Sequence, residues 1–175
     1  MHVLQWIAVQ ADDNSHAFSS VKHYLEVNMG SEDSYASWYD WFVTGGGRWN
    51  DNGKDPYDDD NQSMVLSFET DPDLFEEQVL KAMENRKEEF DRYAKDINPD
   101  ILARIISDYN PREKNFSVFS ELYPLKKVVD MVYGEWDFNS YFFDCENDNT
   151  SPKYMFESID KGNKNWYIVP VDFHF

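Results

Sequence analysis

A run of three glycines, Gly45–Gly47, precedes Arg48 and lies between two tryptophans, Trp41 and Trp49. Consecutive glycines allow successive backbone N–H groups to converge on one point, a geometry that binds anions. The arginine would supply a counter-charge, and the indole rings would supply flat surfaces on which a base can stack. The pattern indicates a pocket for a nucleotide or phosphate group, whose ligand-binding residues would be Trp41, Gly45, Gly46, Gly47, Arg48 and Trp49.

The same glycine run also has a purely structural interpretation. GGGR has neither the GxxxxGK[ST] spacing of a P-loop nor the GxGxxG spacing of a dinucleotide fold. The glycines would instead let the backbone turn tightly beneath large indoles, while Arg48 pairs with Asp40 or Asp51. The spacing favours this structural interpretation, and the ligand pocket is the alternative.

The segment YDWFVTGGGRWN resembles a WDWYxxGGRW-like signature in uncharacterised bacterial and phage proteins. The matching positions are Trp41, Phe42 and Gly46–Trp49. Tyr39 stands where the signature has its first tryptophan, and an additional Gly45 precedes the glycine pair. The resemblance implies a recurrent structural element and transfers no catalytic role.

The chain is strongly acidic, with 34 Asp and Glu against 16 Lys and Arg, for a formal net charge of -18. Nucleic acids and anionic membranes are bound through positive surfaces, so this charge argues against both as direct partners. The acidity is concentrated: residues 51–100 contain 16 acidic and 6 basic side chains, whereas residues 151–175 contain three of each. A basic protein partner is therefore expected, with acidity that serves only solubility as the alternative.

The acidic segment combines a loop with the helix expected after it. A surface dense in carboxylates can imitate part of the charge of duplex DNA, although a solvated, salt-paired helix face is the simpler interpretation for the helix alone. The leading hypothesis is a non-enzymatic binding protein, of the kind that phage inhibitors represent, occupying a basic nucleic-acid-handling site on a partner. The alternative is a small-ligand protein that binds or processes a nucleotide or phosphate at Gly45–Trp49. The residues expected to contact the partner are Asp55, Asp58, Asp59, Asp60, Glu76, Glu77, Glu84 and Glu88.

Metal or cofactor chemistry finds little support. The acidic loop at 51–60, alone or with Asp144, Glu146 and Asp148, has oxygen ligands that suit calcium, but the EF-hand spacing is absent and a solvated loop is favoured. The histidines form neither HExxH nor HxH, so we expect no metal site and no cofactor.

Conventional catalytic residues are also few. Cys145 has no base beside it in the sequence and is expected to be inert, and no GxSxG element is present. If the two terminal strands pair antiparallel, His2 and His174 lie close together. Histidines at such strand ends are more often exposed and without function, so the protein is not expected to be an enzyme.

The elements that must position these residues follow from hydrophobic periodicity and turn signals. They predict an α+β fold: a single antiparallel or mixed sheet of four to five strands with helices packed on one face. Residues 1–175 would form one domain with a long acidic, glycine-containing loop at about 30–63. Pro170 argues for an edge position or a bulge in the last strand. The expected strands are 3–10, 64–70, one within SYFFDCEN and one within NWYIVPVDFHF; the expected helices are 16–28 (capped by Asn14 or Ser15), 72–97, a short one after Asn98-Pro99, and one near 121–133.

The compartment is expected to be a reducing one. Cys145 is the only cysteine, so an intramolecular disulfide is impossible. The first residues lack the basic region and cleavage site of a signal peptide. These features predict a soluble protein in the cytoplasm of the cell or of an infected host.

Overall fold

A computed structural model describes residues 1–29, 38–50, 55–58, 60–108 and 119–175. Five strands form one mixed sheet in the order β2-β5-β1-β4, and β3 pairs with β5 as well. β1 and β5 are antiparallel along their whole length, whereas β4 runs parallel to β1. This confirms the predicted α+β class. The strands are β1 His2–Gln10, β2 Trp41–Thr44, β3 Leu66–Ser67, β4 Phe142–Asp144 and β5 Trp166–His174.

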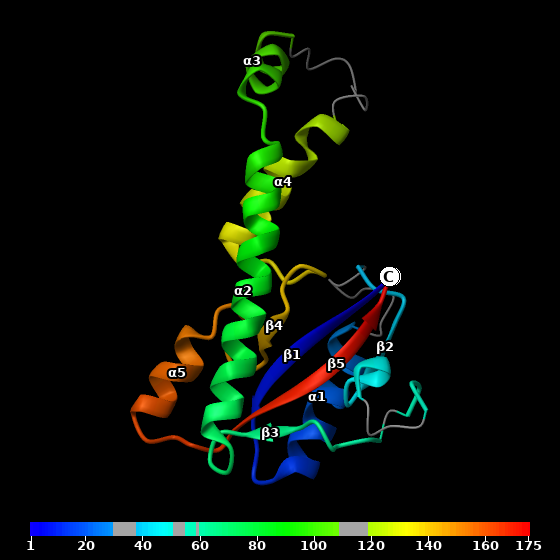
Figure 1. Ribbon diagram of the computed structural model, residues 1–175, viewed down its shortest axis with the longest axis vertical. Coiled ribbons are helices and arrows are strands. Elements are labelled where there is room, and N and C mark those ends of the chain that lie inside the picture. The colour runs from blue at the N-terminus through cyan, green and yellow to red at the C-terminus, as the bar shows by residue number, and fades with distance from the viewer. Residues whose placement is uncertain (30–37, 51–54, 59, 109–118) are drawn as a thin grey trace.

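Helices cover both faces of the sheet, not one as the sequence predicted (Figure 1). The reason is that the central strands carry apolar side chains at successive positions, which point to opposite faces. Ile7 of β1 packs on the side of α1, while Trp6 packs on the side of α2 and α5. The helices are α1 Asn14–Met29, α2 Pro72–Asp96, α3 Pro99–Asp108, α4 Phe119–Tyr133 and α5 Lys153–Asp160.

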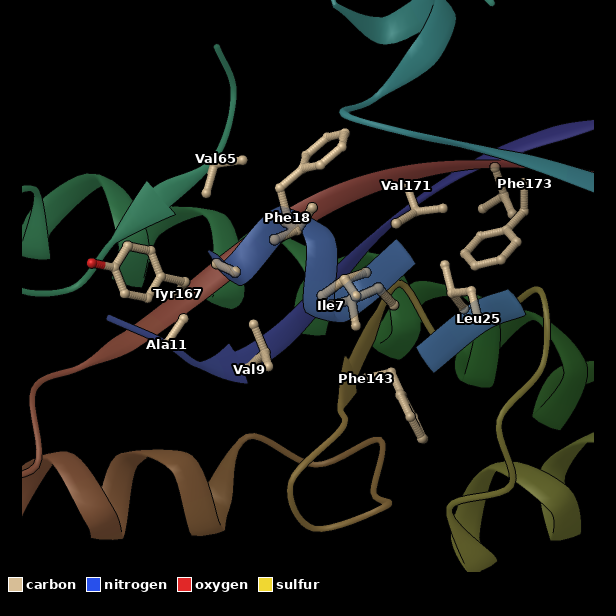
Figure 2. Close-up of a cluster of buried hydrophobic side chains, with 14 residues drawn as sticks. Ile7, Val9, Ala11, Phe18, Leu25, Val65, Phe143, Tyr167, Val171 and Phe173 are labelled. Atoms are coloured by element: carbon tan, nitrogen blue, oxygen red, sulfur yellow. The ribbon is translucent and has the colours of Figure 1, made fainter. Parts of the chain in front are cut away.

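The α1 side of the sheet contains the first part of the core (Figure 2). Phe18 and Leu25 of α1 lie against Ile7, Val171 and neighbouring strand residues, all of them buried. On the other side, Phe75 and Val79 of α2 are fully buried against the α2 face of β1 and β5. The sheet is therefore the middle layer of three.

α2 extends well beyond the sheet, and α4 packs alongside its distal half (Figure 1). α3 lies at the far end of this helical arm. None of the helices in the described ranges combines the length and the apolar composition needed to cross a bilayer.

Several predicted boundaries change in the structure. The Asp13 carboxylate accepts the backbone N–H of His16 at 2.8 Å, so Asp13 caps α1 in place of Asn14 or Ser15. The region 30–63 is not wholly irregular, because it contains β2 and the 3-10 helix η1, Gly47–Trp49. β3 is only two residues long, and α5 was not predicted.

Pro170 lies in the centre of the sheet, so the predicted edge position or bulge is wrong. β5 pairs with β1 on one side and with β2 and β3 on the other. The carbonyl of Pro170 accepts the N–H of Gly45 at 2.8 Å, just after β2 ends at Thr44. The backbone nitrogen and carbonyl oxygen of a strand residue point to the same side, so the nitrogen of Pro170 also points toward the glycine turn. Because proline has no N–H, it cannot donate there, but no neighbouring strand needs that donor.

Candidate functional site

The backbone conformation at positions 45–47 requires glycine. All three residues have positive φ, at 93° for Gly45, 93° for Gly46 and 48° for Gly47. A Cβ on Gly45 would lie 2.1 Å from the carbonyl oxygen of Asn61. The N–H of Gly45 already donates to Pro170, so it is not available to a ligand. The turn is therefore a close backbone passage, in agreement with the structural interpretation.

The glycine turn lies directly over Asp172 of β5. A Cβ on Gly47 would come within 2.8 Å of the Asp172 carboxylate, which is 1% exposed. The backbone N–H of Arg48 donates to this carboxylate at 3.4 Å, and Nε of Arg48 lies 3.8 Å from it. The predicted pairing of Arg48 with Asp40 is not seen, because Asp40 lies beside His174. The other predicted partner, Asp51, is outside the described residues.

His2 is the second group held by Asp172. Its Nδ1 lies 3.0 Å and 3.2 Å from the two carboxylate oxygens, and its side chain is 13% exposed. In the antiparallel register Leu4 faces Asp172, which places His2 diagonally across from it on the same face of the sheet. A carboxylate acceptor at Nδ1 favours the proton on that nitrogen and leaves Nε2 as a hydrogen-bond acceptor.

His174 and Trp41 complete the cluster around His2. The expectation that the terminal histidines meet is confirmed, because His2 and His174 are register partners with ring centroids 4.8 Å apart. The Trp41 ring stacks on His174 at 4.9 Å with an interplanar angle of 9°. Nδ1 of His174 lies 3.3 Å from Asp40, within ion-pair distance but outside hydrogen-bonding geometry. Neither histidine is fully exposed, contrary to the usual outcome at a strand end.

A cleft of about 370 Å³ opens next to His2, between β1 and α2 and beside η1. Lys81 from α2 and His2 from β1 give it cationic or proton-bearing groups, and Trp6 and Trp49 give it aromatic surface. None of the described residues lining it carries a carboxylate, in a chain with a net charge of -18. The lining residues are His2, Val3, Leu4, Trp6, Trp49, Gln78, Lys81, Ala82, Asn85 and Tyr141.

Tyr141 closes one side of the cleft in an unusual backbone conformation. Its φ is 58°, which residues other than glycine rarely adopt and which often marks functional positions. Its carbonyl accepts the N–H of Trp6 at 2.8 Å, which fixes it to β1. Burial raises the pKa of Tyr141 to about 12, further above neutral pH than that of a free phenol.

The acidic residues predicted to contact a partner do not form one continuous surface. Asp60 lies 3.8 Å from Lys22 of α1, whereas the glutamates belong to α2 on the opposite face of the sheet. Asp59 is outside the described residues. All the others are exposed: Asp55, Asp58, Asp60, Glu76, Glu77, Glu84 and Glu88. Within the described part of the chain, no group of three or more His, Cys, Asp or Glu side chains is arranged to hold a metal ion.

Cys145 lines a second cavity, of about 350 Å³, together with His23. The sequence suggested no base near this thiol, and the fold does bring a histidine to the same cavity. Burial is nevertheless the largest effect on the thiol and raises its pKa, with the nearby carboxylates Asp144, Glu146 and Asp148 acting in the same direction. The thiol stays protonated, which makes it a poor nucleophile.

The raised pKa of Cys145 predicts a loss of stability at alkaline pH. Unfolded, the thiol releases its proton above about pH 8.5, while the folded chain retains it, so the free energy of unfolding should fall as pH rises from there. The slope should approach 1.4 kcal/mol per pH unit between about pH 8.5 and 9.5, below the tyrosine range. Urea unfolding at several pH values measures it. Cys145→Ala is the control and should lack this slope; equal slopes would contradict the assignment.

The chain matches no protein-family model, no curated protein and no solved structure in the comparisons made. Its function is therefore inferred from the geometry of the cleft and of the cluster around Asp172. Of the residues that the sequence predicted for a ligand site, Trp49 lines the cleft, whereas Trp41, Arg48 and the three glycines are not among its described lining residues. The pair His2–Asp172 and the cleft residues Lys81 and Tyr141 were not predicted. The available signal was the strand register, since antiparallel terminal strands that bring His2 to His174 also bring it to Asp172.

Proposed function

We propose that the protein binds a small anionic ligand with an aromatic ring, of the nucleotide class, in the cleft beside the Gly45–Trp49 turn. The observation that carries this proposal is the composition of the cleft. In a protein dense in carboxylates, the described lining residues include Lys81 and His2 but no acidic side chain. Such a site attracts an anion locally against the overall field of the protein.

The size and the remaining lining residues support the same ligand class. A volume of about 370 Å³ lies near the lower end of ligand pockets, roughly 300–1,000 Å³, so it suits one small molecule and not a polymer. Trp49 is 47% exposed and offers a ring face on which a base can stack. Gln78 and Asn85 provide amides that can hydrogen-bond to base edges.

The experiment that tests this proposal is calorimetric titration with adenosine, guanosine, cytidine and uridine 5′-monophosphates at low salt. The matched variants are Lys81→Glu and Lys95→Glu, which make the same charge change on the same helix inside and outside the cleft. Lys81→Glu should weaken binding at least about tenfold, whereas Lys95→Glu should change it by less than about twofold. No binding by the wild type, or equal effects of the two variants, would contradict the proposal.

Substitution of Arg48 distinguishes a structural role of the turn from a ligand-binding role. Its side chain is 49% exposed, and its contact with Asp172 through the backbone N–H does not depend on the side chain. We expect Arg48→Ala to lower the free energy of unfolding by less than about 1 kcal/mol while weakening nucleotide binding several-fold. Urea unfolding and calorimetry measure the two effects. A large stability loss without a change in binding would show that Arg48 is only structural.

A second candidate function is the binding of a basic protein partner, in the manner of a phage-type inhibitor. The favouring observation is that the described carboxylates at 55–60 and on the outer side of α2 are exposed to solvent. Association would be salt-sensitive and would involve Glu77, Glu84 and Glu88. Affinity capture from host lysate at 50 and 500 mM salt, with the three glutamates changed to glutamine as a control, tests it. Capture that depends on neither salt nor the glutamates would reject it.

A further inference from the structure

We propose that His2, held by Asp172, is a general base in the cleft, and that the cleft hydrolyses a phosphodiester within a single nucleotide, such as a nucleoside cyclic phosphate. This inference rests on the proposed nucleotide site. It adds a reaction, and it assigns a role to a buried carboxylate that ligand binding alone does not require.

The carboxylate of Asp172 is buried among hydrogen-bond donors. A desolvated carboxylate is costly unless donors surround it, and three donor groups converge on this one: Nδ1 of His2, the backbone N–H of Arg48 and, at longer range, Nε of Arg48. Gly47 lacks the Cβ that would block this arrangement. The turn and the central strand together thus hold an imidazole in one orientation.

The contact with Asp172 leaves one ring nitrogen of His2 for a proton transfer. With Nδ1 paired to Asp172, its other nitrogen, Nε2, is the one left to accept a proton. His2 itself lines the cleft, and its ring is fixed by edge contacts with Trp41 and His174. An imidazole that is oriented by a buried carboxylate and that lines a ligand cavity is the arrangement that general-base catalysis needs.

The reaction follows from this geometry. Nε2 of His2 takes a proton from a water molecule, and the water oxygen forms a bond to phosphorus. The P–O bond to the leaving ribose oxygen, on the opposite side of the phosphorus, breaks; that oxygen takes a proton from solvent, and Nε2 releases its proton to solvent. The product is a nucleoside monophosphate with one more free hydroxyl than the substrate. Lys81 lines the cleft together with His2, and Arg48 directly precedes the cleft residue Trp49 in η1. These two cations can offset the negative charge of the phosphoryl oxygens.

The substrate class follows from the size of the cleft. At about 370 Å³ it is suited to one nucleotide, so the scissile diester must lie within that nucleotide and not between two. Tyr141 also lines the cleft, and its phenol is a hydrogen-bond donor at neutral pH.

The first test is independent of any substrate. The ¹⁵N chemical shifts of the His2 ring in the wild type should report a proton on Nδ1 and none on Nε2. Asp172→Asn replaces the acceptor by a similar group that can also donate, and it should shift the ring toward the Nε2–H form. An Nε2–H ring in the wild type, or no change in Asp172→Asn, would overturn the role of Asp172.

The second test is kinetic and uses 2′,3′-cyclic AMP and 3′,5′-cyclic AMP as probes. His2→Gln and Asp172→Asn should lower kcat by about 10²–10⁴-fold with little change in KM, and adenosine monophosphates should still bind His2→Gln. Wild-type binding of the monophosphates without hydrolysis of either probe would overturn this inference and leave the binding function standing. Absence of monophosphate binding would instead reject the proposed function and this inference with it. Hydrolysis unchanged in His2→Gln would overturn the assignment of the base.

Discussion

Gly45→Ala is expected to lower the free energy of unfolding by roughly 4 kcal/mol. The residue has a φ of 93°, and an added Cβ would lie 2.1 Å from the carbonyl oxygen of Asn61. Because the obstructing atom belongs to the backbone, relief requires a movement of the chain and not a rotation of a side chain. Urea unfolding followed by fluorescence or circular dichroism measures the change.

Gly162→Ala is the matched control for Gly45→Ala. Gly162 has almost the same φ, 96°, but nothing lies within 4 Å of an added Cβ. It should therefore show only the strain of the left-handed backbone, roughly 2 kcal/mol. If the two variants were equally destabilised, the close passage of the glycine turn over Asn61 would be contradicted.

Phe75→Ala is expected to lower the free energy of unfolding by about 3–5 kcal/mol. The ring is fully buried where α2 packs on the sheet, and it meets Phe68 edge-on at 5.5 Å. Its loss leaves a cavity beneath the same helix that carries Lys81, so nucleotide affinity should fall as well. Urea unfolding and calorimetry on one variant measure both effects.

Leu80→Ala provides the control on the same helix. Leu80 is 58% exposed, so its truncation should change stability by no more than about 0.5 kcal/mol. Comparable losses from Phe75→Ala and Leu80→Ala would contradict the packing of α2 on the sheet.

The sequence predicted α2 closely because its signals are local. Asp71 and Pro72 mark its start, and apolar residues from Phe75 onward repeat at helical spacing. β1 and β5 were recognisable for the same reason. β2 was missed because its four residues run directly into the glycines, and local composition then resembles a loop.

The candidate site was less predictable because its parts come from distant segments. His2 and Asp172 are 170 residues apart, and only the register of the terminal strands brings them together. The cleft further depends on how α2 packs on the sheet, which brings Lys81 to the same cleft as His2 and has no local sequence signal. The coverage of both faces of the sheet was not predicted, although the sequence contains a signal for it. Apolar residues at consecutive strand positions, such as Trp6 and Ile7, indicate that a strand is buried on both faces.

The most direct test of the cleft as a nucleotide site is an NMR titration that follows the tryptophan indole N–H signals as adenosine 5′-monophosphate is added. Trp6 and Trp49 line the cleft, whereas Trp136 lies on the opposite side of the sheet and donates to Gln5 at 2.6 Å. We expect saturable shifts for Trp6 and Trp49 and none for Trp136. Shifts at Trp136 alone, or no shifts at any indole, would contradict the proposed function.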